Sequence, residues 1–165
     1  MKMKLIVFAL LTLALAACAG SAQPDAPAQE PAQVPVASTT IHVYKSPTCG
    51  CCGNWVDRLV EYEFDVGTED MDNLTGIKKQ YGVPANLQSC HTAVVDGYVI
   101  EGHVPPADIE QLLAERPDAV GLTVPGMVVG LSGMEVPGSP VQPYDVVLFD
   151  ESGQISLFAS YGQAE

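Results

Sequence analysis

Positive charge is scarce in this sequence. Its 165 residues include 7 lysines and arginines against 20 aspartates and glutamates, which gives a formal net charge of −13 at pH 7. A chain with this balance offers little electrostatic attraction to nucleic acid or to an anionic membrane surface. We therefore expect no nucleic acid among its partners, and no membrane binding that depends on a basic protein surface.

The sequence also lacks an apolar run long enough for an ordinary transmembrane helix, and it contains no internal repeat. Its N-terminal apolar run, residues 5–16, is short and follows two lysines, as in a secretory signal peptide. The run closes with Leu15-Ala16-Ala17-Cys18, which resembles a bacterial lipobox. We predict that residues 1–17 are a lipoprotein signal peptide and that Cys18 is lipidated. The alternative is a plain signal peptide beside an incidental cysteine.

Ala19 follows the predicted lipidation site, where an aspartate would resemble an inner-membrane retention signal. The expected location is therefore the periplasm of a Gram-negative bacterium, on a lipid anchor in the outer membrane. Aromatic residues are absent from residues 18–39, which are rich in Ala, Pro, Gln and Ser. Such a composition predicts a disordered tether, and leaves residues 40–165 as the folded domain.

Residues 40–165 alternate between strand-like and helix-like patterns. We predict strands at 41–44, 64–66, 92–95, 98–103, 145–149 and 155–158. We predict helices at 52–62, 71–81 and 105–116. The resulting order, β-α-β-α-β-β-α followed by a hairpin, is that of a thioredoxin-like domain. The predicted fold is α/β, with a central mixed sheet flanked by helices and an extra C-terminal β-hairpin.

Three cysteines stand together between the first predicted strand and the first predicted helix. At a helix N-terminus, free N–H groups and the helix dipole stabilise a thiolate. Cys49 and Cys52 form a Cys-x-x-Cys pair, which is typical of thiol–disulfide exchange. Cys51 adds a third thiol that competes in such a cycle but suits a soft metal such as Cu(I) or Zn(II). A structural disulfide with one spare buried thiol is the remaining alternative.

Cys90-His91 lies just before the third predicted strand. In thioredoxins the corresponding segment carries a proline that lies against the Cys-x-x-Cys loop. That alignment predicts that Cys90 and His91 approach the three other cysteines. A solvent-facing residue at the start of a strand is the alternative for His91.

Five segments carry distinctive motifs: residues 46–55, 89–93, 101–105, 124–127 and 133–135. Together they resemble the CopG-like periplasmic proteins of bacterial copper resistance. The resemblance implies a thioredoxin-like fold that binds copper through its cysteines as a multinuclear cluster and interconverts Cu(I) and Cu(II). It also implies that His103 is a ligand. Residues 128–132 depart from the Pro/Ser-rich loop expected between the two methionines, Met127 and Met134, for which we expect packing roles.

Three functions follow as hypotheses. The first is a copper protein that captures periplasmic copper and changes its oxidation state, with zinc as the less favoured metal. The second is a thiol–disulfide oxidoreductase with Cys49 as nucleophile and Cys52 as resolving thiol. The third is a passive metal chaperone or buffer, so the sequence leaves open whether the protein is an enzyme. The expected protein partners are copper-efflux or electron-transfer proteins of the periplasm. The predicted metal ligands are Cys49, Cys51, Cys52, Cys90, His91 and His103.

Overall fold

A computed structural model describes residues 40–162 of the chain. The predicted signal peptide, the lipidation site Cys18 and the tether lie outside the described residues. Within residues 40–162 no helix is long and apolar enough to cross a membrane. The strands are β1 (Thr40–Lys45), β2 (Asp65–Asp70), β3 (Thr92–Val95), β4 (Tyr98–Glu101), β5 (Gly121–Thr123), β6 (Tyr144–Phe149) and β7 (Ile155–Tyr161). The helices are α1 (Gly50–Glu61), α2 (Thr75–Gln80), the 3-10 turn η1 (Ala85–Leu87) and α3 (Pro106–Glu115).

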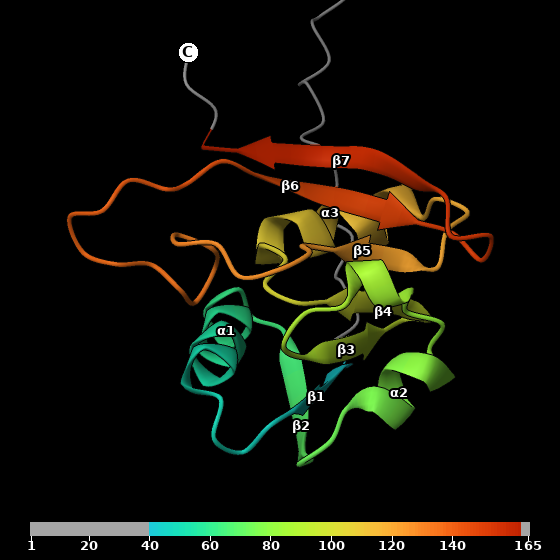
Figure 1. Ribbon diagram of the computed structural model, residues 1–165, viewed down its shortest axis with the longest axis horizontal. Coiled ribbons are helices and arrows are strands. Elements are labelled where there is room, and N and C mark those ends of the chain that lie inside the picture. The colour runs from blue at the N-terminus through green and yellow to red at the C-terminus, as the bar shows by residue number, and fades with distance from the viewer. Residues whose placement is uncertain (1–39, 163–165) are drawn as a thin grey trace, which may run out of the picture. The chain divides into compact units, whose positions relative to one another are not determined.

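The strands form one sheet in the order β2-β1-β3-β4-β5-β6-β7 (Figure 1). β1 pairs with β2 and β4 pairs with β5 in parallel, while the other neighbours are antiparallel. The sheet is therefore mixed, as predicted, and β6 and β7 form the predicted C-terminal hairpin. This hairpin extends the thioredoxin-like order of elements on the β5 side.

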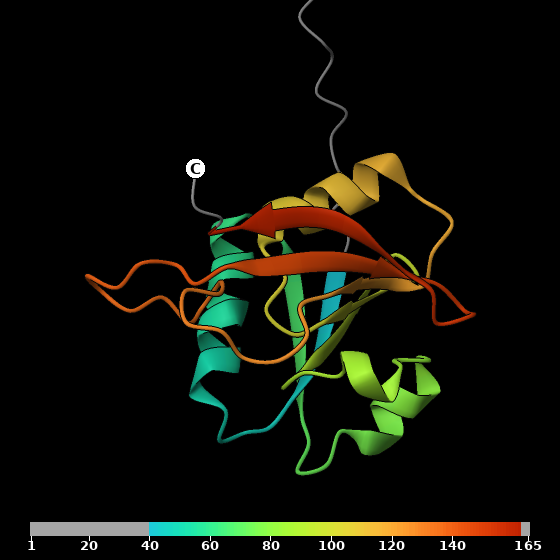
Figure 2. The ribbon, with the colours of Figure 1, turned by 45° about the horizontal axis from the view of Figure 1, so that its top comes forward.

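Two apolar clusters lie on opposite faces of the sheet, because neighbouring residues of a strand point to opposite sides. Ile100 belongs to the larger cluster, together with Trp55 of α1 and Ile109 of α3. Val99 belongs to the smaller cluster, where it joins Leu87 of η1. Figure 2 shows α1 and α3 on one side and the α2 region apart from them. The sheet thus separates α1, which follows the cysteines, from α2.

The structure differs from the sequence prediction at several elements: β4 ends at Glu101 rather than at 103, β7 runs on to Tyr161, and η1 was not predicted. Three further differences, at β2, α2 and β5, have clear physical reasons. β2 runs on to Asp70, and α2 begins only at Thr75, because Asn73 Oδ1 accepts a hydrogen bond from the Thr75 backbone N–H at 2.9 Å and turns the chain. The acidic residues between these points belong to a strand end and a turn rather than to a helix. β5 was missed because it has only three residues and begins at Gly121, where a Cβ would collide with the Val99 carbonyl.

Candidate metal centre

The three clustered cysteines occupy the turn between β1 and α1, residues 46–52, which we call the cysteine turn. Pro47 follows the last residues of β1, and the Cys49 N–H donates to the Ser46 carbonyl at 3.2 Å. Cys49 is the N-cap of α1, and its Sγ accepts from the Cys52 backbone N–H at 3.4 Å. One N–H of the first helical turn therefore faces this sulfur, a position that favours negative charge on it when Cys49 is reduced to a thiolate.

The cysteine turn is oxidised in this structure. Cys49 and Cys52 form a disulfide, whereas Cys51 and Cys90 are free thiols. Cys49 Sγ lies 3.5 Å from Cys51 Sγ, so the third thiol stands against the disulfide. The Cys-x-x-Cys pair can thus form the bond used in thiol exchange, and ligation of a metal by all the cysteines requires reduction of that bond first.

The second group of donors comes from Ser89–Thr92, which we call the histidine segment, and from the end of β4. Cys90 Sγ lies 3.3 Å from His91 Nδ1, and the Gly102 N–H donates to the His91 carbonyl at 3.0 Å. That backbone bond places His103 beside His91, with their rings edge to face and their centroids 4.9 Å apart.

These donors form two overlapping clusters. In each, the ligand atoms lie within 4.8 Å of one another. The first cluster is Cys49, Cys51, Cys52 and Cys90, and the second is Cys52, Cys90, His91 and His103. The structure therefore brings all six predicted ligands together, and Cys52 and Cys90 belong to both clusters. Their role as ligands stays a prediction. One cluster is purely sulfur, which suits Cu(I), and the other combines sulfur with imidazole nitrogen.

Both histidines are fully buried. His103 Nδ1 lies 2.7 Å from the Ser132 carbonyl oxygen, which can only accept, so Nδ1 donates and Nε2 carries the lone pair. The Nε2 atoms of His91 and His103 have no hydrogen-bond partner among the described residues. Burial lowers the pKa of both histidines, that of His91 strongly and with a further contribution from His103. Neutral imidazoles with an unpartnered buried nitrogen are suited to ligate a metal ion.

The Cys90 thiol is held in its protonated form. Burial is the largest cause, followed by the nearby Cys51, and together they raise the pKa of Cys90 to about 11. A metal ion that binds Cys90 Sγ at neutral pH must therefore displace a proton.

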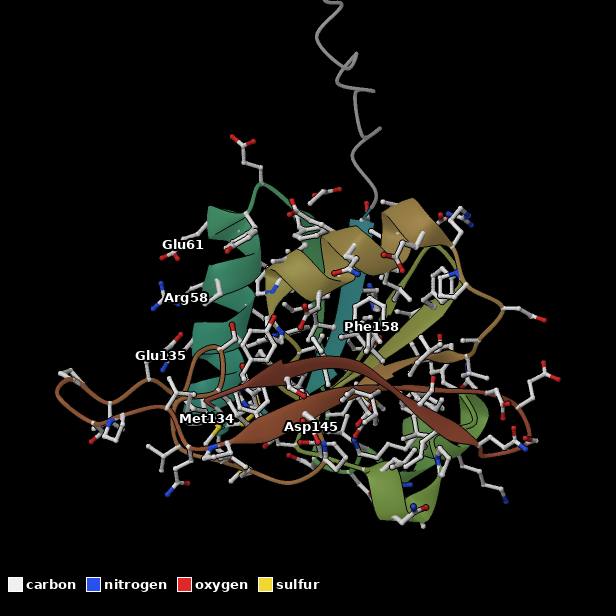
Figure 3. All side chains as sticks on the ribbon, turned by 90° about the horizontal axis from the view of Figure 1, so that it is seen from above. Arg58, Glu61, Met134, Glu135, Asp145 and Phe158 are labelled. Carbon is white, nitrogen blue, oxygen red and sulfur yellow. A yellow bond between two sulfur atoms is a disulfide. The ribbon has the colours of Figure 1, made fainter. Side chains whose placement is uncertain are left out.

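Residues 124–143, which we call the cover loop, close one side of the centre. Gly133 packs directly on α1, because a Cβ there would lie 2.6 Å from the Trp55 backbone nitrogen. Asn54 Nδ2 donates to the Gly133 carbonyl at 3.2 Å. Arg58 Nε lies 3.4 Å from Glu135, and Figure 3 shows Arg58 between Glu61 of α1 and Glu135 of the loop. The loop is thus fastened along α1.

Trp55 links the two donor groups. Its ring centroid lies 4.3 Å from that of His91, and its Nε1 donates to the Val104 carbonyl at 2.8 Å. Trp55 is fully buried in the larger apolar cluster, and no sequence pattern pointed to its contact with His91. The packing role expected for the methionines is confirmed for Met134, which packs on the larger apolar cluster. It is wrong for Met127, which is 62% exposed.

The Ser132 carbonyl, which fixes the His103 ring, could not be predicted from the sequence. A backbone carbonyl leaves no signal in residue type, so no pattern pointed to it. The Gly133 contact left a weak signal, since a glycine inside a loop often marks a close approach of two chain segments.

The comparisons with known proteins agree with this geometry. Residues 87–134 match the family described as "Protein of unknown function, DUF411". Among curated protein sequences, none matches the chain. Two solved structures are similar, described as "Copper resistance protein copG", forms 1 and 2. Each is 43% identical, with TM-scores of 0.71 and 0.70, covering 75% and 74% of this chain and 98% of theirs. The chain belongs to the CopG family of copper-resistance proteins.

Proposed function

We propose that this protein binds copper in the periplasm through the six clustered donors and interconverts Cu(I) and Cu(II) as part of copper resistance. Membership in a copper-resistance family supports copper as the metal. We propose further that Cys18 carries a lipid anchor in the outer membrane. Copper ions are the proposed substrate, and efflux or electron-transfer proteins are the proposed partners.

One observation carries the proposal: a sulfur cluster and a sulfur–imidazole cluster share Cys52 and Cys90. Thiolates favour Cu(I), whereas imidazole nitrogen accepts both oxidation states. Two adjoining donor sets with shared atoms suit a metal that changes oxidation state, because the ion can shift between donors without leaving the protein. This arrangement also supports the binding of more than one copper ion.

The electron count of the Cys49–Cys52 pair fits such chemistry. Oxidation of two thiolates to one disulfide releases two electrons, which reduce two Cu(II) ions to two Cu(I) ions. Cys51 and Cys90 remain free thiols in the disulfide state and, with the histidines, can retain the product. Return to the dithiol state requires two electrons from an external reductant, such as a reduced thiol protein of the periplasm.

A second candidate is a thiol–disulfide oxidoreductase that acts on proteins. It is favoured by the Cys49–Cys52 disulfide at the N-terminus of α1, which is where such enzymes carry their redox pair. The free Cys51, 3.5 Å from Cys49 Sγ, argues against it because this thiol can attack the disulfide and scramble it.

The test is an anaerobic titration of the reduced soluble domain, residues 40–165, with Cu(II). Free thiols are counted, and Cu(I) is measured with a Cu(I)-specific chelator after denaturation. We expect two Cu(I) ions for each disulfide formed. Copper that binds with no loss of thiol and no Cu(I) would indicate a passive chaperone or buffer. A protein that binds no copper but exchanges disulfides with a thiol substrate would indicate the oxidoreductase.

The Cys51→Ser variant separates the first two functions. It removes one sulfur from the sulfur cluster and leaves the Cys49–Cys52 pair intact. Under the copper proposal the number of bound copper ions falls, and under the oxidoreductase proposal disulfide exchange continues. Displacement of Cu(I) by an equal concentration of Zn(II) would overturn the choice of copper.

A further inference from the structure

An ion pair lies buried beside the histidine segment. Glu101, the last residue of β4, is fully buried, and Lys78 of α2 is 6% exposed. Lys78 Nζ donates to Glu101 Oε1 at 2.5 Å. The free energy needed to remove two charges from water offsets much of the free energy of their attraction. An apolar pair of similar volume therefore often stabilises a fold as well or better. The presence of this pair therefore points to a role other than stability.

The Glu101 carboxylate holds both ends of the histidine segment. Its Oε1 accepts from the Ser89 backbone N–H at 2.6 Å, and its Oε2 accepts from the Thr92 hydroxyl at 2.7 Å. Ser89 and Thr92 are the residues immediately before Cys90 and after His91. One carboxylate thus fixes the two flanks of the two-residue segment that carries a sulfur and an imidazole.

Lys78, on α2, completes this arrangement. Besides Glu101, its Nζ donates to Thr92 Oγ1 at 3.1 Å. The Thr92 hydroxyl therefore accepts from the ammonium and donates to the carboxylate, which sets its rotamer. An acceptor that takes three donors at once, as the Glu101 carboxylate does, needs its full negative charge and both oxygens.

The backbone at Glu101 and Gly102 brings the two histidines together. Glu101 pairs with Thr92 across the β3–β4 ladder, and His103 follows it by two residues. Between them, Gly102 has φ +73°, and a Cβ there would lie 2.5 Å from Ser89 Oγ. The backbone after Glu101 is therefore tightly packed at Gly102, and this packing places His103 against His91.

We propose that Glu101, held by Lys78, is a positioning residue that fixes Cys90 and His91 in the geometry required for metal binding. This proposal rests on the copper function proposed above. Outer groups that orient metal ligands commonly account for about a 10- to 100-fold difference in metal affinity. Loss of the carboxylate's hold should therefore weaken copper binding while the fold persists.

The sharpest variants are Thr92→Val and Thr92→Ser. Valine copies the shape of threonine but removes the hydroxyl that Glu101 Oε2 accepts from, whereas serine keeps the hydroxyl. We expect Thr92→Val to lower the Cu(I) affinity by about 10-fold or more, and Thr92→Ser to restore it. The paired change Lys78→Met with Glu101→Gln removes both charges together and should lower the affinity further.

The second readout does not need copper. The Trp55 ring lies 4.3 Å from the His91 ring, so ring currents shift the His91 proton signals in the NMR spectrum. In the copper-free protein we expect Thr92→Val to move these signals and Thr92→Ser to leave them in place. The melting temperature of each variant shows that it is folded.

Asp108→Asn is the matched control. Asp108 is also a buried carboxylate, 4% exposed, and it accepts from the Tyr161 hydroxyl at 2.8 Å, but it holds no predicted ligand. We expect this variant to leave both the copper affinity and the His91 signals unchanged. Equal loss of copper affinity in Asp108→Asn and Thr92→Val would overturn the proposal, because general destabilisation would then explain both.

The remaining outcomes separate this proposal from the copper function. Wild-type copper affinity in Thr92→Val, together with unmoved His91 signals, overturns the positioning role and leaves the copper function standing. Absence of copper binding in the wild type overturns the copper function, and with it the metal part of this proposal. The His91 signals then still decide whether Glu101 fixes the segment.

Discussion

The cysteine turn and the histidine segment offer metal ligands in two different settings. In the turn, Cys49 and Cys51 are half-buried and their Sγ atoms lie 3.5 Å apart, beside a disulfide that can open and close. In the segment, His91 is fully buried and its flanks are held by a buried ion pair. One region can change its covalent state, and the other is built to keep its geometry.

This difference suggests that the two regions have different roles in the proposed centre. A group that exchanges electrons and receives metal from solvent needs access, which the turn provides. A group that retains the metal in both oxidation states needs fixed donors, which buried neutral imidazoles provide. The two regions meet at Cys52 and Cys90, the two residues common to both clusters. The predictions below test whether the two regions can be separated.

The largest effect should come from closing the disulfide. Oxidation of Cys49 and Cys52 removes two sulfur ligands and leaves the histidine segment unchanged. Structural Zn(II) sites with four ligands provide about 10–16 kcal/mol, or roughly 3 kcal/mol per ligand. On the same scale the loss of two sulfurs should approach ~10⁴-fold in Cu(I) affinity. Competition titrations of the reduced and the oxidised protein with a Cu(I) chelator measure this ratio. Equal affinities would mean that the cysteine turn contributes no ligand.

A smaller effect is expected when Cys52→Ser is compared with Cys51→Ser. Cys52 belongs to both clusters, whereas Cys51 belongs only to the sulfur cluster. Cys51→Ser should weaken copper binding by roughly 100-fold, about 3 kcal/mol, and leave the histidine signals responsive to copper. Cys52→Ser should also abolish that response. NMR signals of His91 and His103 during a copper titration distinguish the two variants. Identical behaviour of the two variants would contradict overlapping clusters.

The pH dependence should distinguish Cys90 from the histidines. The pKa of the Cys90 thiol is raised to about 11, so between pH 7 and 9 a metal ion must displace its proton. Protons compete less as the pH rises, so Cu(I) affinity should increase, by about tenfold per pH unit for this one proton. The imidazoles, whose pKa values are lowered, add nothing in this range. Cys90→Ser should reduce the slope of log affinity against pH by one, and an unchanged slope would remove Cys90 from the ligand set.

The smallest effect is expected for Arg58→Met, which removes the ion pairs of Arg58 with Glu61 of α1 and with Glu135 of the cover loop. These pairs are exposed to solvent, and exposed pairs contribute little to stability. We expect wild-type melting temperature and copper affinity. Gly133→Ala is the contrasting change, because its Cβ would meet the Trp55 backbone. If Arg58→Met lowers the melting temperature or the copper affinity and Gly133→Ala does not, the cover loop is held on α1 by charge rather than by packing.

Much of the fold could be predicted from periodicity, but the limits of the elements could not. The helical spacing of apolar residues after Cys52 was enough to place α1, which was predicted at 52–62 and runs over Gly50–Glu61. The start of α2 was misplaced because the Asn73 turn is a side-chain interaction that apolar spacing does not record. β5 was hidden by its length of three residues.

The candidate site was predicted as a set of residues rather than as a geometry. Thiols and imidazoles are rare and chemically distinctive, so their type alone marked them. Lys78 and Glu101 were not singled out, since charged residues usually lie on the surface. Only the β3–β4 register brings Glu101 beside the histidine segment, and only the packing of α2 brings Lys78 to it. The residues that hold the ligands in place, such as Lys78 and Glu101, are of common types. Only the fold gives them this role.

The contact between Gly133 and α1 joins residues that are far apart along the chain: Asn54 and Gly133 are separated by 79 positions. A polypeptide is made from its N-terminus, so the cysteine turn emerges well before the loop that covers it. During synthesis the three thiols therefore stand open while the 79 positions from Asn54 to Gly133 are added. The nascent protein depends on its surroundings, rather than on its own structure, to keep those cysteines from pairing wrongly.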